Sequence, residues 1–299
     1  MTQARLRAAW AGLHGNLRGM VLMGLAAFIF AAEVLAIRWM NARGIPIATQ
    51  LLARSAGQFV WLLPALAAGG VALFRTRRPA MHVFRGACSL ICWGLYFLSF
   101  VWLDAATGTV LSFTNVMFTT LLAAPLLGER VGLARWAGTL LGLAGVAIML
   151  RPGTGIDPFG AALAIGSAIA WCGITLTSRV LTRTERTQTV VAWVGLVTTC
   201  GTLPFAIWYW QPIGLGDAAI LLVFGCVTPG IIWLLTEAYR AGEASAVAPL
   251  QYLRLPMVAL FGWMVLGEVP DAVAWAGATV ILAGAVIITI AEARAIRRG

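Results

Sequence analysis

Three charged residues lie inside stretches that are otherwise apolar: Glu33, Arg54 and Arg254. A charged side chain in membrane hydrocarbon costs about 2.5–3.5 kcal/mol on insertion scales, so each one requires an explanation. We interpret Arg254 as a group that attracts a substrate carboxylate, and Glu33 as one that attracts an ammonium group or a coupling proton. Two structural alternatives remain open. In the first, the aliphatic part of the Arg54 side chain is buried and its charged end reaches the membrane surface. In the second, Glu33 forms an internal ion pair with an arginine.

A polar pair includes Arg254, and a similar pair occurs about 139 residues earlier. Gln251 and Arg254 are three residues apart, as are Ser112 and Asn115, so each pair shares one helical face. Tyr252 lies beside the later pair. Two such faces related by a repeat are expected at a central cavity. The alternative is that these side chains join helices through hydrogen bonds.

Aromatic residues deep in the apolar stretches suggest a second kind of contact, stacking on a flat or apolar solute. Trp93 and Tyr96 share a helical face, and Trp171 and Trp233 also lie far from the ends of their stretches. A packing stripe or a lipid-facing stripe is the alternative. The predicted substrate-binding residues are Glu33, Trp93, Tyr96, Ser112, Asn115, Trp171, Trp233, Gln251, Tyr252 and Arg254.

Residue groups typical of catalysis or metal binding are not evident in the sequence. The two histidines, His14 and His82, are far apart, and the five cysteines lie in apolar stretches as expected of buried thiols. The chain contains no lysine, so it has no phosphate-binding P-loop. We therefore predict no catalytic residue, no metal and no cofactor. A membrane-embedded enzyme stays a remote alternative, and a channel would be expected to show rings of charge.

The composition indicates that membrane helices hold these residues. Of 299 residues, 61% are hydrophobic and 11% are charged, against about a quarter charged in soluble domains. Mean hydropathy is +0.89. About twenty apolar residues cross a bilayer core of about 30 Å, which predicts an all-α polytopic membrane protein with ten transmembrane helices. The predicted spans are 19–40, 47–73, 83–103, 106–127, 131–150, 157–179, 189–210, 215–238, 245–266 and 270–291.

The chain contains an internal duplication. The pattern of residues 126–145 returns at 265–284 at a constant offset of about 139 residues. In each copy, a glycine ends one helix, a glutamate opens the next, and two glycines seven residues apart share a face suited to close helix packing. We predict a first five-helix repeat over 19–150 and a second over 157–291. A cytoplasmic segment, 1–18, and a cytoplasmic basic tail, 292–299, flank them.

Five spans per repeat is an odd number, so the second copy enters the membrane inverted relative to the first. Arginine placement supports this topology and puts both termini in the cytoplasm of a bacterial cell, with the protein in the cytoplasmic (inner) membrane. Because the net charge of +10 comes from arginines beside the bilayer, we predict no nucleic-acid partner. Most arginines fall on the cytoplasmic side: Arg5, Arg7, Arg18, Arg75, Arg77, Arg78, Arg85, Arg130, Arg135, Arg179, Arg183, Arg186, Arg240, Arg294, Arg297 and Arg298.

Inverted repeats are typical of secondary transporters, which use them to open one central site to either side of the membrane in turn. Prolines within or beside the spans mark candidate hinges, because proline interrupts helical hydrogen bonding. The predicted hinges are Pro125, Pro229, Pro249 and Pro256.

Over nearly its whole length the sequence resembles a drug/metabolite transporter of the EamA type. The resemblance is carried by residues 125–130 with Gly138 to Gly145, by Pro256 through Gly267-Glu268 to Gly284, and by Arg54, which matches an arginine common in the second span of such proteins. Met117 stands in the first half where Pro256 stands in the second. The resemblance implies ten helices, two EamA modules and export of small metabolites.

The tryptophan-rich interior is most similar to that of aromatic amino-acid exporters. We therefore predict a secondary transporter that exports small metabolites, foremost amino acids with aromatic or large apolar side chains, by alternating access. A nucleotide-sugar or phosphate-ester carrier, or another exporter of the same superfamily, is the alternative. The sequence leaves proton coupling and the oligomeric state open.

Overall fold

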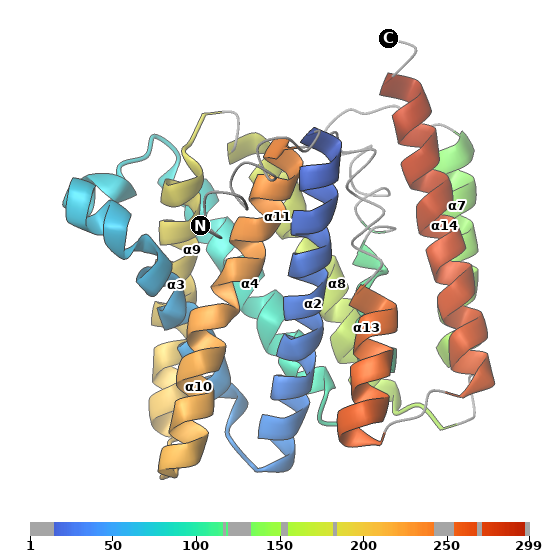
Figure 1. The fold of residues 1–299 in the computed structure, drawn as a ribbon, viewed down its shortest axis with the longest axis horizontal. Coiled ribbons are helices and arrows are strands. Elements are labelled where there is room, and N and C mark those ends of the chain that lie inside the picture. The colour runs from blue at the N-terminus through green and yellow to red at the C-terminus, as the bar shows by residue number, and fades with distance from the viewer. Residues whose placement is uncertain are drawn as a thin grey trace, which may run out of the picture.

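The computed structural model is a bundle of helices, with no β-strand among the residues it describes (Figure 1). The described residues are 15–115, 118, 133–150, 155–181, 184–241, 254–267 and 271–296. Several predictions concern positions outside these ranges: the capping residues Glu129 and Glu268, the hinges Pro125 and Pro249, and the cavity residues Gln251 and Tyr252.

Helices occur in every predicted span. The first half contains α2 (Gly15–Ala42), α3 (Ile47–Gly69) with the 3₁₀ turn η1 (Gly70–Phe74), α4 (Pro79–Ser99), α5 (Ala105–Ser112) and α7 (Leu133–Leu150). The second half contains α8 (Pro158–Leu181), α9 (Thr187–Trp208), α10 (Leu215–Val227), α11 (Pro229–Ala241), α13 (Arg254–Phe261) with the π-helical turn η3 (Gly262–Leu266), and α14 (Ala272–Ile296).

Six helical segments in the described ranges are long and apolar enough to cross a membrane. They are Leu17–Ala42, Ile47–Phe74, Pro79–Ser99, Pro158–Thr177, Thr187–Trp208 and Leu215–Leu235. The full set of ten spans therefore remains a prediction at this point.

Local sequence signals explain several helix ends. Asp104 accepts a hydrogen bond from the backbone N–H of Thr107 at 2.8 Å and so caps α5. Gly267 follows η3 in the left-handed conformation, with φ of 69°, which confirms the predicted glycine end of that helix. The predicted span 215–238 is divided into α10 and α11 at Pro229, because proline has no N–H to continue the helical hydrogen bonds.

Helices of the two halves interdigitate in matched pairs. The helices α2, α3, α4 and α5 correspond to α8, α9, α10–α11 and α13. Accordingly, α4 packs on α8 as α11 packs on α2, α4 packs on α9 as α10 packs on α3, and α5 packs on α8 as α13 packs on α2. Corresponding helices also pack on each other, namely α3 on α9, α5 on α13 and α7 on α14. Exchanging the halves therefore reproduces the principal contacts, as expected if a pseudo-twofold axis relates them.

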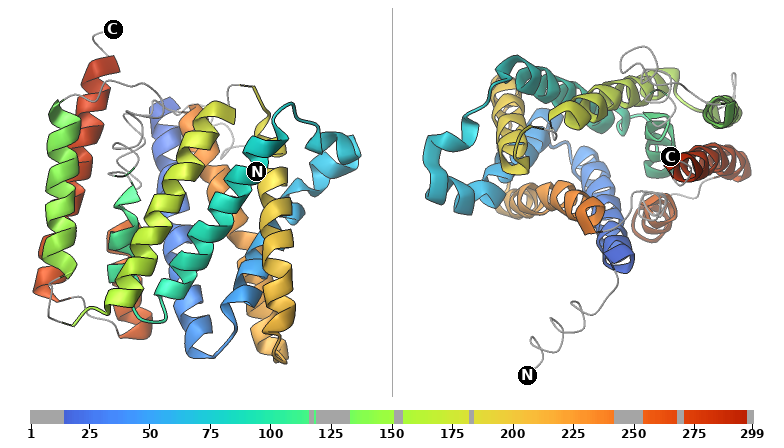
Figure 2. Two further views of the ribbon diagram at one scale, coloured as in Figure 1. Left: turned by 180° about the vertical axis from the view of Figure 1, so that it is seen from behind. Right: turned by 90° about the horizontal axis from the view of Figure 1, so that it is seen from above.

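Corresponding helices run in opposite directions. α2 begins at the upper end of the bundle in Figure 1, whereas its counterpart α8 begins at the lower end. The views in Figure 2 show the same reversal for α3 and α9, for α4 and α10–α11, for α5 and α13, and for α7 and α14. The start of α2 and the end of α14 lie at the same, upper end of the bundle.

Glycines allow the closest helix crossings. A Cβ on Gly284 of α14 would lie 2.5 Å from the carbonyl oxygen of Gly138 and 2.9 Å from the backbone nitrogen of Gly142 on α7. This contact confirms the predicted small-residue face of these two helices. A second crossing joins α3 to α10, where a Cβ on Gly57 would collide with the backbone of Gly225.

Candidate functional site: a central cavity

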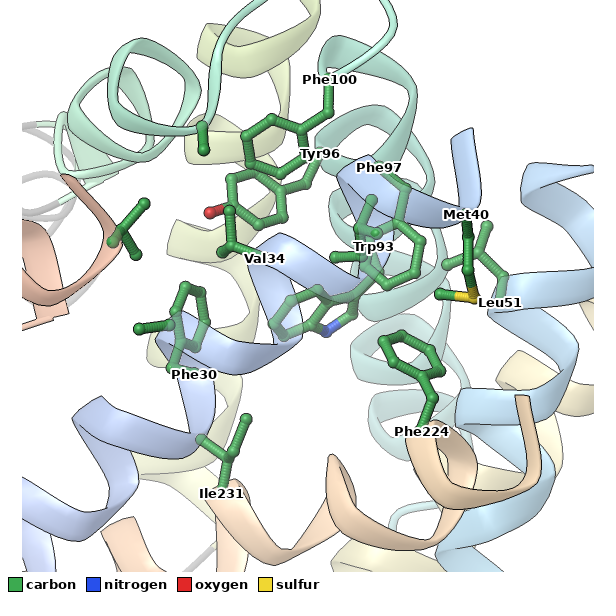
Figure 3. Close-up of a cluster of buried hydrophobic side chains, with 14 of the residues drawn as sticks. Phe30, Val34, Met40, Leu51, Trp93, Tyr96, Phe97, Phe100, Phe224 and Ile231 are labelled. Carbon is green, nitrogen blue, oxygen red and sulfur yellow. The ribbon is translucent and has the colours of Figure 1, made fainter. Parts of the chain in front are cut away.

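Aromatic side chains gather at the centre of the bundle, between α2, α4, α8 and α13. Figure 3 shows Phe30, Trp93 and Tyr96 turned toward one another from α2 and α4. The ring centroids of Trp93 and Tyr96 are 6.0 Å apart, and those of Trp93 and Trp171 are 5.6 Å apart in an edge-to-face arrangement. Such pairs form a rigid wall that can stack against a flat solute.

Two adjoining cavities lie within this aromatic cluster. The smaller, with a free volume of about 10 Å³, is lined by Phe30, Cys92, Trp93, Tyr96, Ser112, Asn115, Ser167, Ala168, Trp171 and Arg254. The larger, of about 50 Å³, is lined by Met23, Ala26, Ala27, Phe30, Arg54, Trp93, Trp171, Ile231, Ile232, Leu235 and Arg254. Phe30, Trp93, Trp171 and Arg254 belong to both, so we treat the two together as the central cavity.

Arg254 enters this cavity from the first turn of α13. Its side chain is buried, and its guanidinium carbon lies 3.9 Å from the ring centroid of Phe113 and 4.6 Å from that of Phe30. Contact with aromatic faces is a favourable setting for a weakly hydrated guanidinium that is removed from water. The structure thus places Arg254 deep in the bundle, as the sequence predicted.

The polar pair of the first half meets Arg254 in the smaller cavity. Ser112 and Asn115 are both 8% exposed and line it together. The Ser112 hydroxyl donates to the carbonyl of Thr109 at 2.6 Å, and the Asn115 carbonyl accepts a weak hydrogen bond from the Cys172 thiol at 3.3 Å. The contact with Cys172 joins the end of α5 to α8.

Arg54 and Glu33 form a buried ion pair. Arg54 Nε donates to Glu33 Oε1 at 2.8 Å, and the two side chains are 4% and 0% exposed. The guanidinium carbon of Arg54 also lies 3.6 Å from the ring centroid of Trp93. The suggestion that Arg54 extends to the membrane surface is therefore wrong, because Glu33 draws its charged end inward. The internal Glu33–arginine pair, left open by the sequence, is present.

Trp233, like Glu33, is a predicted cavity residue that lines neither part of the central cavity. It is 41% exposed on α11, and its ring centroid lies 6.5 Å from that of Trp61. The alignment of the two repeats explains why Trp233 lies outside the cavity, because Trp233 is one residue beyond the position that corresponds to Trp93. One residue turns a side chain by about 100° around a helix. Ile232 occupies the corresponding position and lines the cavity instead.

Several residues that line the central cavity are not among the predicted substrate-binding residues. Phe30 precedes Glu33 by three positions, Cys92 precedes Tyr96 by four, and Ser167 precedes Trp171 by four. Each therefore shares a helical face with a residue that had been selected. A spacing of three or four residues from the predicted residues is the sequence signal that could have identified these lining residues. Among the described residues, no group of three histidine, cysteine, aspartate or glutamate side chains is placed to hold a metal ion.

The EamA-like transporter family matches the chain twice, over residues 17–151 and 158–290. The chain belongs to the EamA-like transporter family. This EamA-like protein is accordingly a multi-pass membrane protein and a secondary transporter of small molecules, and the prediction that it is not an enzyme is confirmed by its family.

Curated relatives of this EamA-like transporter include two riboflavin transporters. That of Rhizobium johnstonii is 31% identical over 94% of this chain and 93% of its own, and that of Vibrio cholerae is 30% identical over 95% and 97%. An S-adenosylmethionine uptake transporter of Rickettsia prowazekii is 28% identical over 77% of this chain and 79% of its own. A solved crystal structure with 22% identity has the same fold, with a TM-score of 0.63 over 92% of this chain and 98% of that one.

Proposed function

We propose that this chain carries flat aromatic metabolites across the membrane by alternating access, with the central cavity as its substrate site. The observation that carries the proposal is the convergence of Trp93, Trp171, Tyr96 and Phe30 on a buried cavity that also contains Arg254. Ligand sites of this kind combine apolar walls with a few polar groups that orient the ligand.

The proposed architecture is ten transmembrane helices arranged as two inverted five-helix repeats. The matched contacts between halves and the reversed direction of corresponding helices support it. In this arrangement the substrate site lies where the halves meet, and rocking one half against the other opens it to each side in turn.

The proposed orientation places the upper end of Figure 1 in the cytoplasm of a bacterial cell, with the protein in the inner membrane. Arg75, Arg77 and Arg78 lie in the connection between η1 and α4 at this end. Three helices that begin at the opposite end, α5, α8 and α10, are preceded or opened by aspartates, namely Asp104, Asp157 and Asp217. Cytoplasmic loops of membrane proteins carry the excess of arginine.

Riboflavin is the first substrate candidate. Its isoalloxazine is a flat ring system suited to stacking on indole faces, and relatives that align over nearly the whole chain are riboflavin transporters. Aromatic amino acids, the substrates first suggested by the sequence, are the second candidate because Arg254 offers a partner for their carboxylate. The aromatic walls favour neither export nor uptake, and the S-adenosylmethionine relative is an uptake transporter.

The cavity must widen to hold such a molecule. Free volumes of about 10 and 50 Å³ accommodate only a few waters. The break between α10 and α11 at Pro229 lies beside the lining residues Ile231 and Ile232, and Pro256 lies in α13 two residues from Arg254. Bending at these prolines would open the walls that carry those residues.

Counterflow in proteoliposomes tests the proposed function. Vesicles that contain the purified protein are loaded with unlabelled riboflavin, tryptophan or S-adenosylmethionine, and entry of the labelled compound is measured with and without a pH gradient. We expect saturable riboflavin counterflow and weaker tryptophan counterflow. Protein-free vesicles are the control. Counterflow of S-adenosylmethionine alone, or of none of the three compounds, would contradict the proposal.

A further inference from the structure

The charged groups around the central cavity are unequally accessible from within it. Arg54 and Arg254 both line the larger cavity, whereas Glu33 lines neither the larger nor the smaller one. The Glu33 side chain is 0% exposed, and Arg54 Nε donates to its Oε1 atom. A solute in the cavity therefore meets two guanidinium groups and no carboxylate among the described lining residues.

Arg54 retains hydrogen-bonding capacity despite its ion pair. Its Nη2 atom is buried and has no hydrogen-bond partner among the residues that the structure describes. Leaving a buried charged donor without an acceptor is costly, so an acceptor supplied by a solute would be favoured at this position. Arg54 and Trp93 both line the larger part of the cavity, so a planar solute bound there would lie near that donor.

The two guanidinium groups come from different halves and contact the same central cluster of aromatic side chains. Arg54 contacts Trp93, and Arg254 contacts Phe30 and Phe113. Trp93 and Phe30 themselves line both parts of the cavity. The flat surfaces and the positive charges are therefore adjacent, which suits a planar molecule whose edge bears negative charge or carbonyl oxygens.

We propose that Arg54 and Arg254 together restrict the substrate to planar molecules with an anionic or acceptor-rich edge, such as a carboxylate or imide carbonyls, and that the cavity rejects planar cations. Glu33 is a positioning residue that holds Arg54 against Trp93 and does not touch the substrate. This inference rests on the proposed function and deepens it. The same charge pattern disfavours a sulfonium such as that of S-adenosylmethionine.

Three indoles that differ in charge provide the test. Indole-3-acetate is an anion, tryptophol is neutral and tryptamine is a cation, while the ring is the same in all three. Binding of each labelled compound to the purified full-length protein is measured by equilibrium dialysis. We expect affinity to fall in that order, with indole-3-acetate bound at least about tenfold more tightly than tryptamine, as loss of a charge-assisted hydrogen bond predicts. Equal affinities, or a preference for tryptamine, would overturn the inference.

Variants of the ion pair separate the roles of its members. Glu33→Gln should strengthen binding of indole-3-acetate several-fold, because the positive charge of Arg54 is then no longer offset. A Glu33→Gln variant that loses tryptamine binding selectively would show direct contact and contradict the positioning role. The double variant Glu33→Gln/Arg54→Gln, which leaves no unpaired charge at this site, should reduce the ratio of anion to cation affinity about tenfold with tryptophol binding unchanged.

Arg43→Gln is the matched control, because Arg43 forms a surface ion pair with Asp217 at 2.9 Å outside the cavity. It should leave all three affinities unchanged. Size-exclusion chromatography establishes that each variant is folded. If the double variant is not folded, the affinities of the three indoles for the wild-type protein alone decide the charge preference. Riboflavin counterflow without a charge preference among the indoles would overturn this inference only. Absence of both counterflow and indole binding would overturn the proposed function as well.

Discussion

The two walls of the central cavity are built from corresponding helix pairs but present different side chains. The α4–α8 wall contributes Trp93, Tyr96 and Trp171, whereas the α2–α11 wall contributes mainly small and aliphatic residues. Both pairs pack in the same way. The two halves therefore provide two related helix arrangements, and the positions where their side chains differ give the cavity its aromatic and charged lining.

The two halves also differ in the charged residues that they place near the cavity. At an offset of about 141 residues, the position that corresponds to Glu33 is occupied by Ile174, and at about 139 residues the counterpart of Arg254 is Asn115. The buried ion pair therefore belongs to the first half, although the packing around it is shared. This asymmetry can be broken experimentally without changing the helix packing.

Breaking the ion pair should have the largest effect. Arg54→Ala leaves the Glu33 carboxylate buried without its partner, so we expect a loss of about 3–5 kcal/mol in the free energy of unfolding. Equilibrium denaturation in detergent micelles measures it. The double variant Glu33→Gln/Arg54→Gln should lie within about 1 kcal/mol of wild type, since neither charge remains. Equal destabilisation by both variants would mean that lost packing, and not the unpaired charge, is responsible.

The glycine crossings should give intermediate effects that differ between the halves. Gly57→Ala forces backbone apart at the α3–α10 crossing, with an expected loss of about 1–3 kcal/mol. At the corresponding α4–α9 crossing, a Cβ on Gly86 would lie 2.5 Å from the Cβ of Val197, which is a smaller overlap than that of Gly57 with the Gly225 backbone, so Gly86→Ala should cost less. Gly24→Ala is the control, because nothing lies within 4 Å of the added atom. Thermal unfolding of the three variants should rank them in that order.

Exchanging single tryptophans should give the smallest effects and sharpen the contrast between the inner and outer faces. Trp93→Leu removes a stacking surface from the cavity, so we expect the apparent affinity for riboflavin in counterflow to fall about two- to tenfold. Trp233→Leu alters a residue that lines neither part of the cavity, so the apparent affinity for riboflavin should change less than about twofold. A larger effect at Trp233 would place the substrate path between α3 and α11.

Much of the fold followed from local patterns in the sequence. Apolar stretches located the helices because hydrocarbon requires every backbone group to be bonded within its own segment. The repeat predicted the correspondence of helices, and the spacing of glycines predicted the α7–α14 contact that Gly284 and Gly138 make. Arg254, Ser112 and Asn115 line the smaller part of the central cavity, as expected of polar groups that avoid lipid, while their contact with substrate stays a prediction.

The positions of the apolar helices, their correspondence in pairs and the inward placement of several polar residues could be predicted from the sequence, since each depends on burial or spacing along one helix. The packing of the helices shows that Arg54 turns toward Glu33 and that Trp233 faces away from the cavity, neither of which the sequence predicted. These outcomes depend on the rotation of one helix against another. A one-residue change in register, which scarcely alters hydrophobicity, turns a side chain from the cavity toward the surface.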